Sequence, residues 1–407
     1  MNFGLSRRRL LQGAAVVSLP RFAKGAAAPV LAYVGTYSSP QGPEGSKGNG
    51  GGICLFEMDR TKGTLVKREM FEDGLNPSWL AFHPSQKYLY AANEVSRFEG
   101  ANSGAVTAYA VDASSGRLAK LNTASSQGAG PAHLSVHPSG KFVFVANYHG
   151  GTFAVLPVLG DGRLGAATDV KRDTGPTGPL HAVSAPKGSF AISGHDRTHA
   201  HMIETDPAGR FVIGSDLGMD RIHVWELNTS AGTLEPAQGS PVVIPAGDGP
   251  RHFVFHPSGR WMYSLQEEGS TIIQFAYDAA TGGLTQTRQV SSLPAGFAGT
   301  NFTSEIRISS DGRFLYAANR LHDSIAWFSI AKDGSLTLDG ETWTRGDYPR
   351  SFTIDPSGNF LYCCNQRGDA VTCFRVNRES GELSFTGDYT PVGTPSIVVF
   401  RKDATAG

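Results

Sequence analysis

The sequence contains few cysteines, few charged residues and no apolar segment of the length that spans a membrane. Only 4 of the 407 residues are cysteine and no two of them form a Cys-x-x-Cys pair, which excludes a cysteine-based zinc or redox site of that type. Lys and Arg number 36, as do Asp and Glu, and charged residues make up only 18% of the chain. This balance gives no reason to expect nucleic acid or an anionic membrane surface as a partner.

The N-terminal segment has the pattern of an export signal rather than of a membrane anchor. A twin-arginine run at residues 7–9 precedes an apolar stretch at residues 10–19, and small residues at 26–28 offer a cleavage site. The apolar stretch is far shorter than the roughly 20 residues that cross a bilayer. We therefore expect residues 1–28 to be a twin-arginine signal peptide, and the mature protein to be periplasmic or secreted.

A repeated stretch organises the rest of the chain, and its clearest copy covers residues 249–267. This copy contains two short apolar strands joined by the turn His256-Pro257-Ser258-Gly259. Similar copies begin at Asn76 and at Gly130. An internal repeat of this kind decides the fold before local propensities do.

Four kinds of strand recur in each repeat. The first kind precedes the turn and begins near Ser78, Ala132, Ala200, Arg251, Ser304, Arg350 and Ser396. The second kind follows the turn and covers residues 31–36, 88–93, 142–147, 211–216, 261–266, 314–319 and 360–365. A third strand of alternating apolar residues and a weaker fourth strand complete a repeat of about 50 residues. Seven such repeats predict an all-β, seven-bladed β-propeller over residues 29–402, with residues 403–407 as a C-terminal tail.

At each end of the chain, one strand lacks the hairpin partner that the other repeats have. The strand at residues 31–36 has no first strand before it, and the strand at residues 394–400 has no second strand after it. We expect these two strands to pair within one blade, which ties both chain ends into the ring and removes an open sheet edge.

The cysteines are predicted to be free thiols. Cys363 and Cys373 fall on neighbouring strands of one predicted hairpin, whereas Cys54 is remote in sequence. An oxidising compartment would permit disulfides, but adjacent strands seldom offer relaxed disulfide geometry. Small buried thiols are therefore expected.

Polar residues gather at one end of the predicted hairpins. Because the first and second strands form a hairpin, the start of one and the end of the other lie on the same face of the ring, at the mouth of its channel. His83, His137 and His256 lie in the turns at the opposite end, where turn formation explains them. The candidate site residues at the channel mouth are His133, His199, His201, Asp216, Arg251, His252, Glu267, Glu305, Arg320 and Arg350.

Three arginines on this face, Arg251, Arg320 and Arg350, exceed what bridging between blades requires. Together with His201 and Glu267 they suggest a pocket for a small anion, because guanidinium groups match carboxylate and phosphate. Structural ion pairs between blades, such as Arg251 with Glu267, are the alternative interpretation.

Metal and cofactor chemistry have little support in the sequence. His199 and His201 lie two positions apart on a strand, where they share a face, but no third ligand accompanies them. The sequence contains no Gly-x-Ser-x-Gly elbow, phosphate loop or dinucleotide fingerprint. We therefore expect neither a metal nor a cofactor.

One repeat carries an insertion. Pro138 and Pro207 are 69 residues apart, whereas Pro207 and Pro257 are 50 apart, which places extra chain at residues 174–198. A second long loop, rich in Gly and Ser, covers residues 38–52. Each loop is either solvated slack or a lid over the predicted pocket.

Several segments of the sequence resemble the propeller-type 6-phosphogluconolactonase (lactonase) family, in order and from about residue 30 to residue 400. The most specific of them is Asp216-Leu217-Gly218-Met219-Asp220-Arg221. Other matching segments are Tyr33-Val34-Gly35-Thr36-Tyr37, His199-Ala200-His201, Gly249-Pro250-Arg251-His252 and Pro349-Arg350-Ser351-Phe352. The sequence departs from the family in the longer segment at residues 174–198 and in Thr198, where the family often has proline.

The resemblance implies hydrolysis of a sugar-acid lactone, although the family also includes a fungal carboxy-muconate lactonizing enzyme. The family's proposed active-site residues correspond to His201, Arg251, Glu267 and Arg320. His201 or Glu267 would then activate water as a general base, and the two arginines would stabilise the oxyanion. Arg350 would bind a remote anionic group.

Two other functions stay open: cycloisomerisation of a muconate-like diacid, and a non-catalytic propeller that binds a partner in the cell envelope. For the lactonase we expect a lactone or sugar acid as the bound partner, no nucleic acid, no membrane contact after signal cleavage, and a monomer. An exported enzyme would not meet the sugar phosphates of the cytoplasm, which argues against a phosphorylated substrate.

Overall fold

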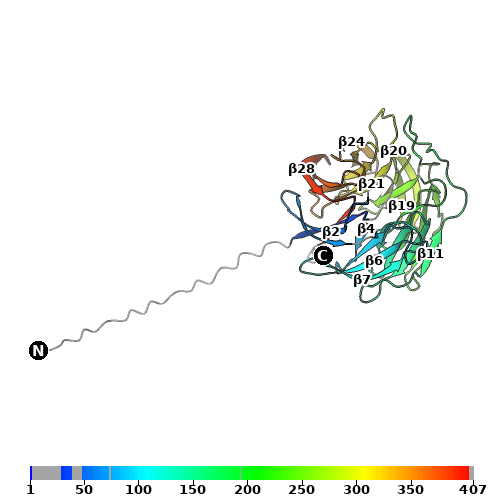
Figure 1. The fold of residues 1–407 in the computed structure, drawn as a ribbon. Coiled ribbons are helices and arrows are strands. Elements are labelled where there is room, and N and C mark those ends of the chain that lie inside the picture. The colour runs from blue at the N-terminus through cyan, green and yellow to red at the C-terminus, as the bar shows by residue number, and fades with distance from the viewer. Residues whose placement is uncertain (2–28, 39–47, 73–74, 193, 403–407) are drawn as a thin grey trace.

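The computed structural model describes residues 1, 29–38, 48–72, 75–192 and 194–402. Within these ranges the chain forms seven antiparallel sheets arranged as the blades of a ring (Figure 1). This confirms the predicted all-β, seven-bladed propeller. The predicted signal peptide, apart from Met1, and the tail at residues 403–407 lie outside the described residues. No helix in the described ranges is long and apolar enough to cross a membrane.

Each blade contains four strands in the order that the repeat predicts, and one blade has a short fifth strand. The innermost strands, which contact one another around the channel, are β4 (Pro77–Phe82), β8 (Pro131–Val136), β12 (Ala200–Thr205), β17 (Pro250–Phe255), β21 (Thr303–Ile308), β25 (Pro349–Ile354) and β29 (Pro395–Phe400). The second strands are β1 (Val30–Thr36), β5 (Tyr88–Asn93), β9 (Phe142–Asn147), β13 (Phe211–Asp216), β18 (Trp261–Gln266), β22 (Phe314–Asn319) and β26 (Phe360–Asn365).

Exposure is highest at the outermost strand of each blade. The third strands are β2 (Gly52–Met58), β6 (Ala105–Val111), β10 (Thr152–Pro157), β14 (Arg221–Asn228), β19 (Thr271–Asp278), β23 (Ser324–Ile330) and β27 (Ala370–Val376). The outermost strands are β3 (Leu65–Glu72), β7 (Leu118–Ser125), β11 (Asp169–Arg172), β15 (Thr233–Pro236), β20 (Gly283–Ser291), β24 (Leu336–Trp343) and β28 (Leu383–Pro391), and the short β16 (Val242–Val243) also pairs with β14.

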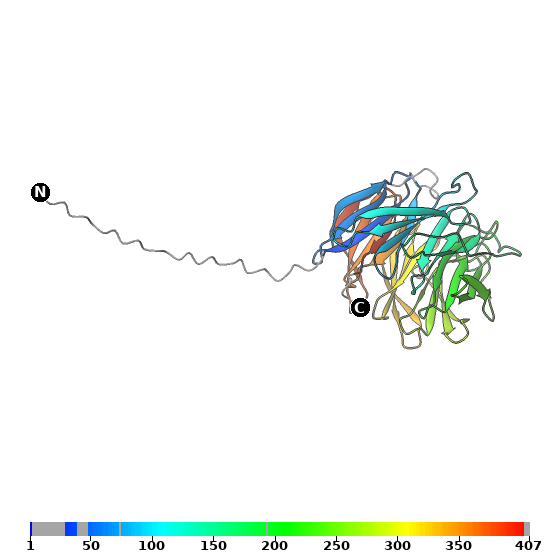
Figure 2. The same cartoon turned by 90° about the horizontal axis from the view of Figure 1, so that it is seen from below.

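The two chain ends close the ring as predicted. Strand β29 pairs antiparallel with β1, with Tyr33 opposite Val399, and this sheet continues through β2 to β3. Figure 2 shows the blue and red strands of this blade together. Every residue of β1 is buried, so the strand that β29 pairs with lies in the core.

Tyrosines of the second strands fasten neighbouring blades to each other. Each has 0% exposure, and its hydroxyl donates a hydrogen bond to a glycine carbonyl in a turn of an adjacent blade. A buried hydroxyl without a hydrogen-bond partner would carry a desolvation penalty. Each tyrosine therefore favours the one placement of the neighbouring blade in which its hydroxyl reaches the glycine carbonyl. The pairs are Tyr33 with Gly116, Tyr90 with Gly162, Tyr263 with Gly334, Tyr316 with Gly381, and Tyr362 with Gly63.

The turn histidines have the structural role that the sequence predicts. The Nε2 atoms of His83, His137 and His256 lie 3.1, 2.7 and 3.0 Å from carbonyl oxygens in the next turn around the ring. The four cysteines are buried and free, which agrees with the prediction of unpaired thiols.

Candidate active site

Two positions in each blade bring side chains to one mouth of the channel. The first lies near the start of the innermost strand, where the register with the second strand shifts by a β-bulge. A bulge leaves an extra residue unpaired and re-aims its side chain. His201, Arg251 and Arg350 are such residues, and Ser78 occupies the same position in its blade.

The second position is the residue directly after the second strand. Its backbone N–H donates to a carbonyl just before or at the start of the innermost strand, as Glu267 does to Gly249 at 2.7 Å and Glu94 does to Asn76 at 2.9 Å. Tyr37, Tyr148 and Arg320 make the same backbone bond in their blades. This repeated bond fixes the direction in which each of these side chains leaves its strand.

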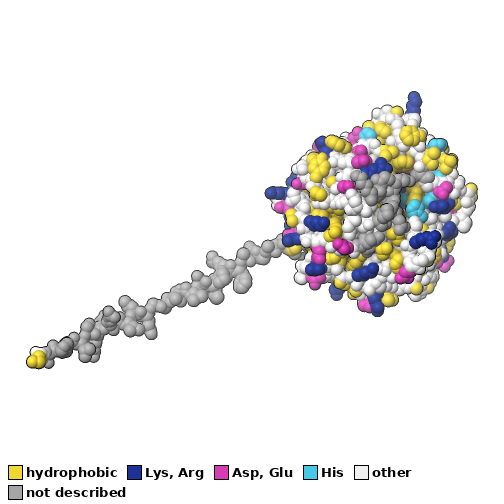
Figure 3. Space-filling view, viewed as in Figure 1, with side chains coloured by type: hydrophobic (Ala, Val, Ile, Leu, Met, Phe, Trp, Pro, Cys, Tyr) yellow, Lys and Arg dark blue, Asp and Glu magenta, His cyan; other side chains and the backbone are white. Residues whose placement is uncertain are grey.

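Side chains from these positions line a cavity of about 380 Å³. Five predicted site residues lie on its wall: His199, His201, Glu267, Arg320 and Arg350. The remaining lining residues that matter for the chemistry are Glu94, Tyr148, His149, Ile192, Gly194, Asp196, Phe302 and Tyr348. On the molecular face drawn in Figure 3, side chains of both charge signs are interspersed without a large area of either sign.

Glu267 joins two arginines at the cavity wall. Its Oε2 atom accepts a hydrogen bond from Arg251 Nε at 2.9 Å and lies 2.7 Å from Arg320 Nη2. Burial would raise the pKa of Glu267, but the charges of Arg320 and Arg251 outweigh burial and lower it. Glu267 is therefore an anion that positions two guanidinium groups, and it is poorly suited to accept a proton.

Arg320 presents its guanidinium between two aromatic rings. Its Nη1 lies 3.2 Å from the Tyr348 hydroxyl, and its guanidinium carbon lies 5.2 Å from the Tyr348 ring centre and 5.4 Å from that of Phe302. Burial tends to lower the pKa of Arg320, but the charge of Glu267 raises it, so Arg320 stays cationic. A fixed cation in a partly desolvated wall is suited to a developing negative charge.

His201 is the imidazole best placed to act as a base. Only 4% of the residue is exposed, it lines the cavity, and its Nδ1 has no hydrogen-bond partner among the described residues. Burial, together with the positive charges of Arg251, Arg350 and Arg320, holds the pKa of His201 well below 6.5. The ring is therefore neutral at pH 7 and can accept a proton.

His199 supports the wall instead of facing the cavity freely. Its Nδ1 lies 2.9 Å from the Tyr148 carbonyl and its Nε2 lies 2.7 Å from Asp196 Oδ1. The ring also stacks on Tyr148, with centroids 4.4 Å apart. Both nitrogens of His199 thus contact oxygens of the chain.

Four of the other predicted site residues do not line this cavity. Arg251 is 2% exposed and lies behind Glu267. Its Nη1 lies 3.3 Å from His252 Nε2, and His252 Nδ1 lies 3.3 Å from Glu305 Oε1. His133 packs near His252, with ring centroids 5.6 Å apart, and lines a separate cavity on the other side. These residues form a polar support beneath the cavity floor.

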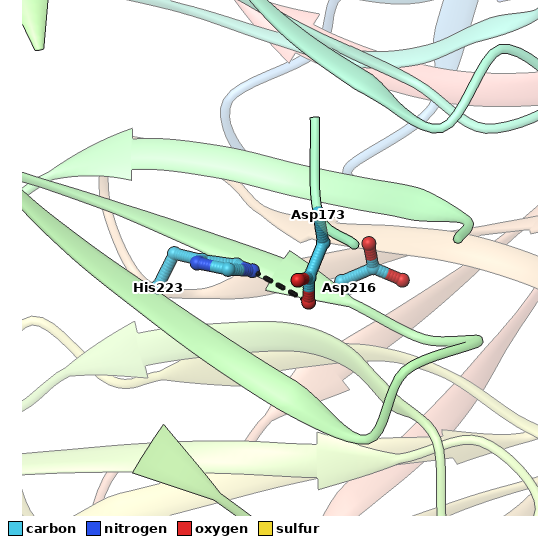
Figure 4. Close-up of side chains that lie close together, drawn as sticks. All are labelled: Asp173, Asp216 and His223. Atoms are coloured by element: carbon cyan, nitrogen blue, oxygen red, sulfur yellow. Dashed lines mark hydrogen bonds and ion pairs between the residues drawn. The ribbon is translucent and has the colours of Figure 1, made fainter. Parts of the chain in front are cut away.

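Asp216 also lies outside the cavity lining. It is fully buried, and with Asp173 and His223 it forms the group drawn in Figure 4, whose ligand-type atoms lie within 4.8 Å of one another. Asp173 accepts hydrogen bonds from Arg221 at 2.7 Å and His223 at 3.0 Å. These donors, one of them cationic, compete with a metal ion for the carboxylate.

The oxygens of Asp216 are engaged with the chain at residues 198 and 199. Asp216 accepts a bond from the His199 N–H at 2.8 Å and another from the Thr198 hydroxyl. Asp173 and Asp216 therefore hold the two ends of the insertion at residues 174–198. This is a structural clamp, which explains why Asp216 belongs to the motif without reaching the cavity.

The insertion contributes directly to the cavity wall through Ile192, Gly194 and Asp196. The insertion is fixed near its C-terminal end by His195, which has Nδ1 3.0 Å from Glu268 Oε1 and Nε2 3.1 Å from Asp220 Oδ1. Burial opposes protonation, but hydrogen bonds to the two carboxylates raise the pKa of His195 to about 9. These contacts hold the C-terminal part of the insertion in place at the cavity wall.

Several lining residues were not selected from the sequence. The sequence places Glu94 and Tyr148 on the same face as Glu267 and Arg320, directly after a second strand, but does not single them out as candidate site residues. Tyr348 and Phe302 lie just before innermost strands, and no residue pattern marks them.

Comparison with known proteins agrees with this architecture. The family described as "Lactonase, 7-bladed beta-propeller" matches residues 31–400. A 6-phosphogluconolactonase of Bacillus subtilis is 32% identical over 371 residues, covering 91% of this chain and 98% of the relative. A 6-phosphogluconolactonase of Formosa agariphila is 31% identical over 339 residues, covering 82% and 91%.

Among solved structures, the periplasmic gluconolactonase of Pseudomonas aeruginosa superposes with a TM-score of 0.81. It is 29% identical, and the match covers 92% of this chain and 99% of that one. The family match, the relatives and the shared fold extend over nearly the whole propeller. The chain therefore belongs to the seven-bladed β-propeller lactonase family.

Proposed function

We propose that this protein hydrolyses a sugar-acid lactone in the cavity lined by His201, Glu267 and Arg320. The observation that carries the proposal is a neutral, unpaired imidazole and a carboxylate-held guanidinium on the wall of one cavity. Ester-type hydrolysis needs a base for water and a cation for the oxyanion, and these are the two groups present. The names of the relatives support the same reaction class.

In the first step His201 removes a proton from water while the water oxygen bonds to the lactone carbonyl carbon. The carbonyl oxygen becomes an oxyanion, and Arg320 donates hydrogen bonds to it. Arg251 acts through Glu267, because it lies behind that residue and holds its carboxylate. Arg251 is thus a positioning residue in this mechanism.

In the second step the carbon–oxygen bond of the ring breaks. The carbonyl re-forms, and the imidazolium of His201 returns its proton to the departing ring oxygen, which becomes a hydroxyl. The product is the open-chain sugar acid, and His201 is again neutral for the next turnover. Every atom and proton is accounted for by water, the lactone and this chain's own side chains.

We also propose that the protein works outside the cytoplasm, as a monomer without membrane contact. The twin-arginine run at residues 7–9 and the small residues that follow the apolar stretch support export. Cell fractionation of the full-length protein and of an Arg8→Lys, Arg9→Lys variant tests this. Export predicts loss of the periplasmic fraction in the variant, and an unchanged distribution would contradict it.

The reaction is tested by following acid release from δ-gluconolactone in a stopped-flow instrument. The wild type should accelerate opening above the spontaneous rate in buffer. Arg320→Gln should lose about 100-fold or more of that acceleration, the usual effect of removing an oxyanion donor. His256→Gln, which changes only a structural turn, should keep it. Equal rates for wild type and buffer would contradict the proposal.

A further inference from the structure

Glu94 is a second carboxylate on the cavity wall, and it is held differently from Glu267. Its Oε2 atom accepts hydrogen bonds from the hydroxyls of Tyr37 and Ser78, both at 2.7 Å. The donors are neutral, whereas both partners of Glu267 Oε2 are guanidinium groups. Glu94 is 6% exposed, so this anchoring fixes one oxygen within the wall and leaves the other available to the cavity.

The available oxygen of Glu94 lies beside Arg350. Arg350 Nη2 is 3.8 Å from Glu94 Oε1, which is ion-pair range but too long for a hydrogen bond. The Arg350 side chain is 11% exposed and its guanidinium carbon lies 5.7 Å from the Tyr37 ring centre. A carboxylate acceptor, Glu94 Oε1, and the guanidinium donors of Arg350 therefore lie side by side. This arrangement suits hydroxyl groups, because each hydroxyl both donates and accepts a hydrogen bond.

Carboxylates accompany the arginines around the cavity. Each arginine that lines it or supports its wall has a carboxylate within 4 Å: Arg320 and Arg251 face Glu267, at 2.7 and 2.9 Å, and Arg350 faces Glu94 at 3.8 Å. Asp196 adds a third carboxylate at the rim. A phosphate monoester carries about −1.5 to −2 charges at pH 7 and would meet the repulsion of these carboxylates, which an uncharged lactone does not.

We propose that Glu94 and Arg350 form a hydroxyl-binding subsite that selects an uncharged polyhydroxy lactone over its phosphorylated form. This inference rests on the proposed lactonase function and names its substrate class. Glu94 accepts hydrogen bonds from ring hydroxyls, and Arg350 donates to the same hydroxyls. Glu94 and Asp196 repel a terminal phosphate.

The test compares kcat/KM for δ-gluconolactone and for its 6-phosphate. The wild type should favour the uncharged lactone by about tenfold or more. Glu94→Gln should lower kcat/KM for the uncharged lactone about tenfold, mainly through KM, because a charged acceptor is lost. The same change removes repulsion, so the value for the 6-phosphate should fall less or rise. The preference should therefore shrink.

A matched control is Glu226→Gln, which makes the same chemical change on an exposed residue of β14 outside the cavity, and both rates should stay unchanged. Tyr37→Phe removes one of the two hydrogen bonds that anchor Glu94, and it should shift the substrate preference in the same direction as Glu94→Gln. This second variant provides the test if Glu94→Gln does not fold. A wild type that prefers the 6-phosphate, or a preference that Glu94→Gln and Tyr37→Phe leave unchanged, would overturn the inference. Failure to accelerate either lactone would instead overturn the lactonase function itself.

Discussion

Glu267 Oε2 lies 2.9 Å from Arg251 Nε, across the hairpin that β17 and β18 form. The two residues are 16 positions apart in sequence, one at the bulge of the inner strand and the other directly after the second strand. Arg320 reaches the same oxygen from the next blade. One carboxylate therefore connects two blades and two cationic groups, and this connection makes Glu267 important for both stability and function.

Glu267→Gln should destabilise the protein strongly. Removing the carboxylate leaves two buried guanidinium groups without their shared counter-ion, a change that typically costs about 3–5 kcal/mol. Thermal unfolding followed by circular dichroism measures it. The exposed variant Glu226→Gln should shift the melting temperature little, and equal shifts for the two variants would show that Glu267 is not a buried counter-ion.

The pH dependence of kcat/KM should report His201 in the free enzyme. Because its pKa lies well below 6.5, the active neutral form should dominate at neutral pH, and activity should fall only as acid protonates the ring. The expected profile is flat between about pH 6.5 and 8, with an acid limb whose midpoint is below 6.5. An acid limb centred near pH 7 or above would contradict His201 as the buried base.

His195 should make stability depend on pH in the alkaline range. Its folded-state pKa of about 9 lies above the ordinary 6.5, so protonation stabilises the fold fully below about pH 6.5 and that contribution is lost as pH rises through 9. The difference corresponds to about 3 kcal/mol. The groups that face the ring are Asp220 and Glu268.

The measurement is the melting temperature of the wild type and His195→Gln between pH 6 and 10. The gap between them should be widest near pH 6 and close toward pH 10. His181→Gln, an exposed change on the same insertion, should melt like the wild type throughout. A pH-independent gap for His195→Gln would show that the ring acts by packing and not by charge.

Deleting residues 394–407 should destabilise the whole ring. The deletion removes β29, which pairs with β1 and packs against the innermost strands on both sides, β25 and β4. We expect a fall in melting temperature of about 10 °C or more, since burial of an entire inner strand is lost. Deletion of residues 403–407 alone serves as the control. A protein without β29 that kept its melting temperature would contradict ring closure.

The strands were predictable because each repeat marks them independently. The second strands at residues 88–93, 142–147 and 360–365 have the predicted bounds, since an apolar run begins after a Pro-Ser-Gly or Pro-Ser-Gln turn and ends at an asparagine. The number of blades and the closure of the ring then follow from the number of first and second strands. The hydrogen bonds of tyrosines such as Tyr263 also fix how neighbouring blades pack. The sequence does not predict these bonds, because the acceptor glycine lies in a turn of another blade.

The site was less predictable because its geometry depends on bulges and on contacts between blades. Of the candidate site residues, His201 and Arg350 line the cavity, whereas Arg251 occupies the same bulge position and lies behind Glu267. His252 continues one position further and packs beneath the cavity. Contacts between blades, as well as the position along the strand, therefore decide which side chain reaches the cavity, and the sequence does not show these contacts.

The most direct test of the account is the rate at which His201→Gln hydrolyses δ-gluconolactone. Losing the base should reduce kcat by about 100-fold or more, with KM nearly unchanged, while the melting temperature stays close to that of the wild type. A folded His201→Gln variant that hydrolyses the lactone at the wild-type rate would contradict the assignment of the active site to this cavity.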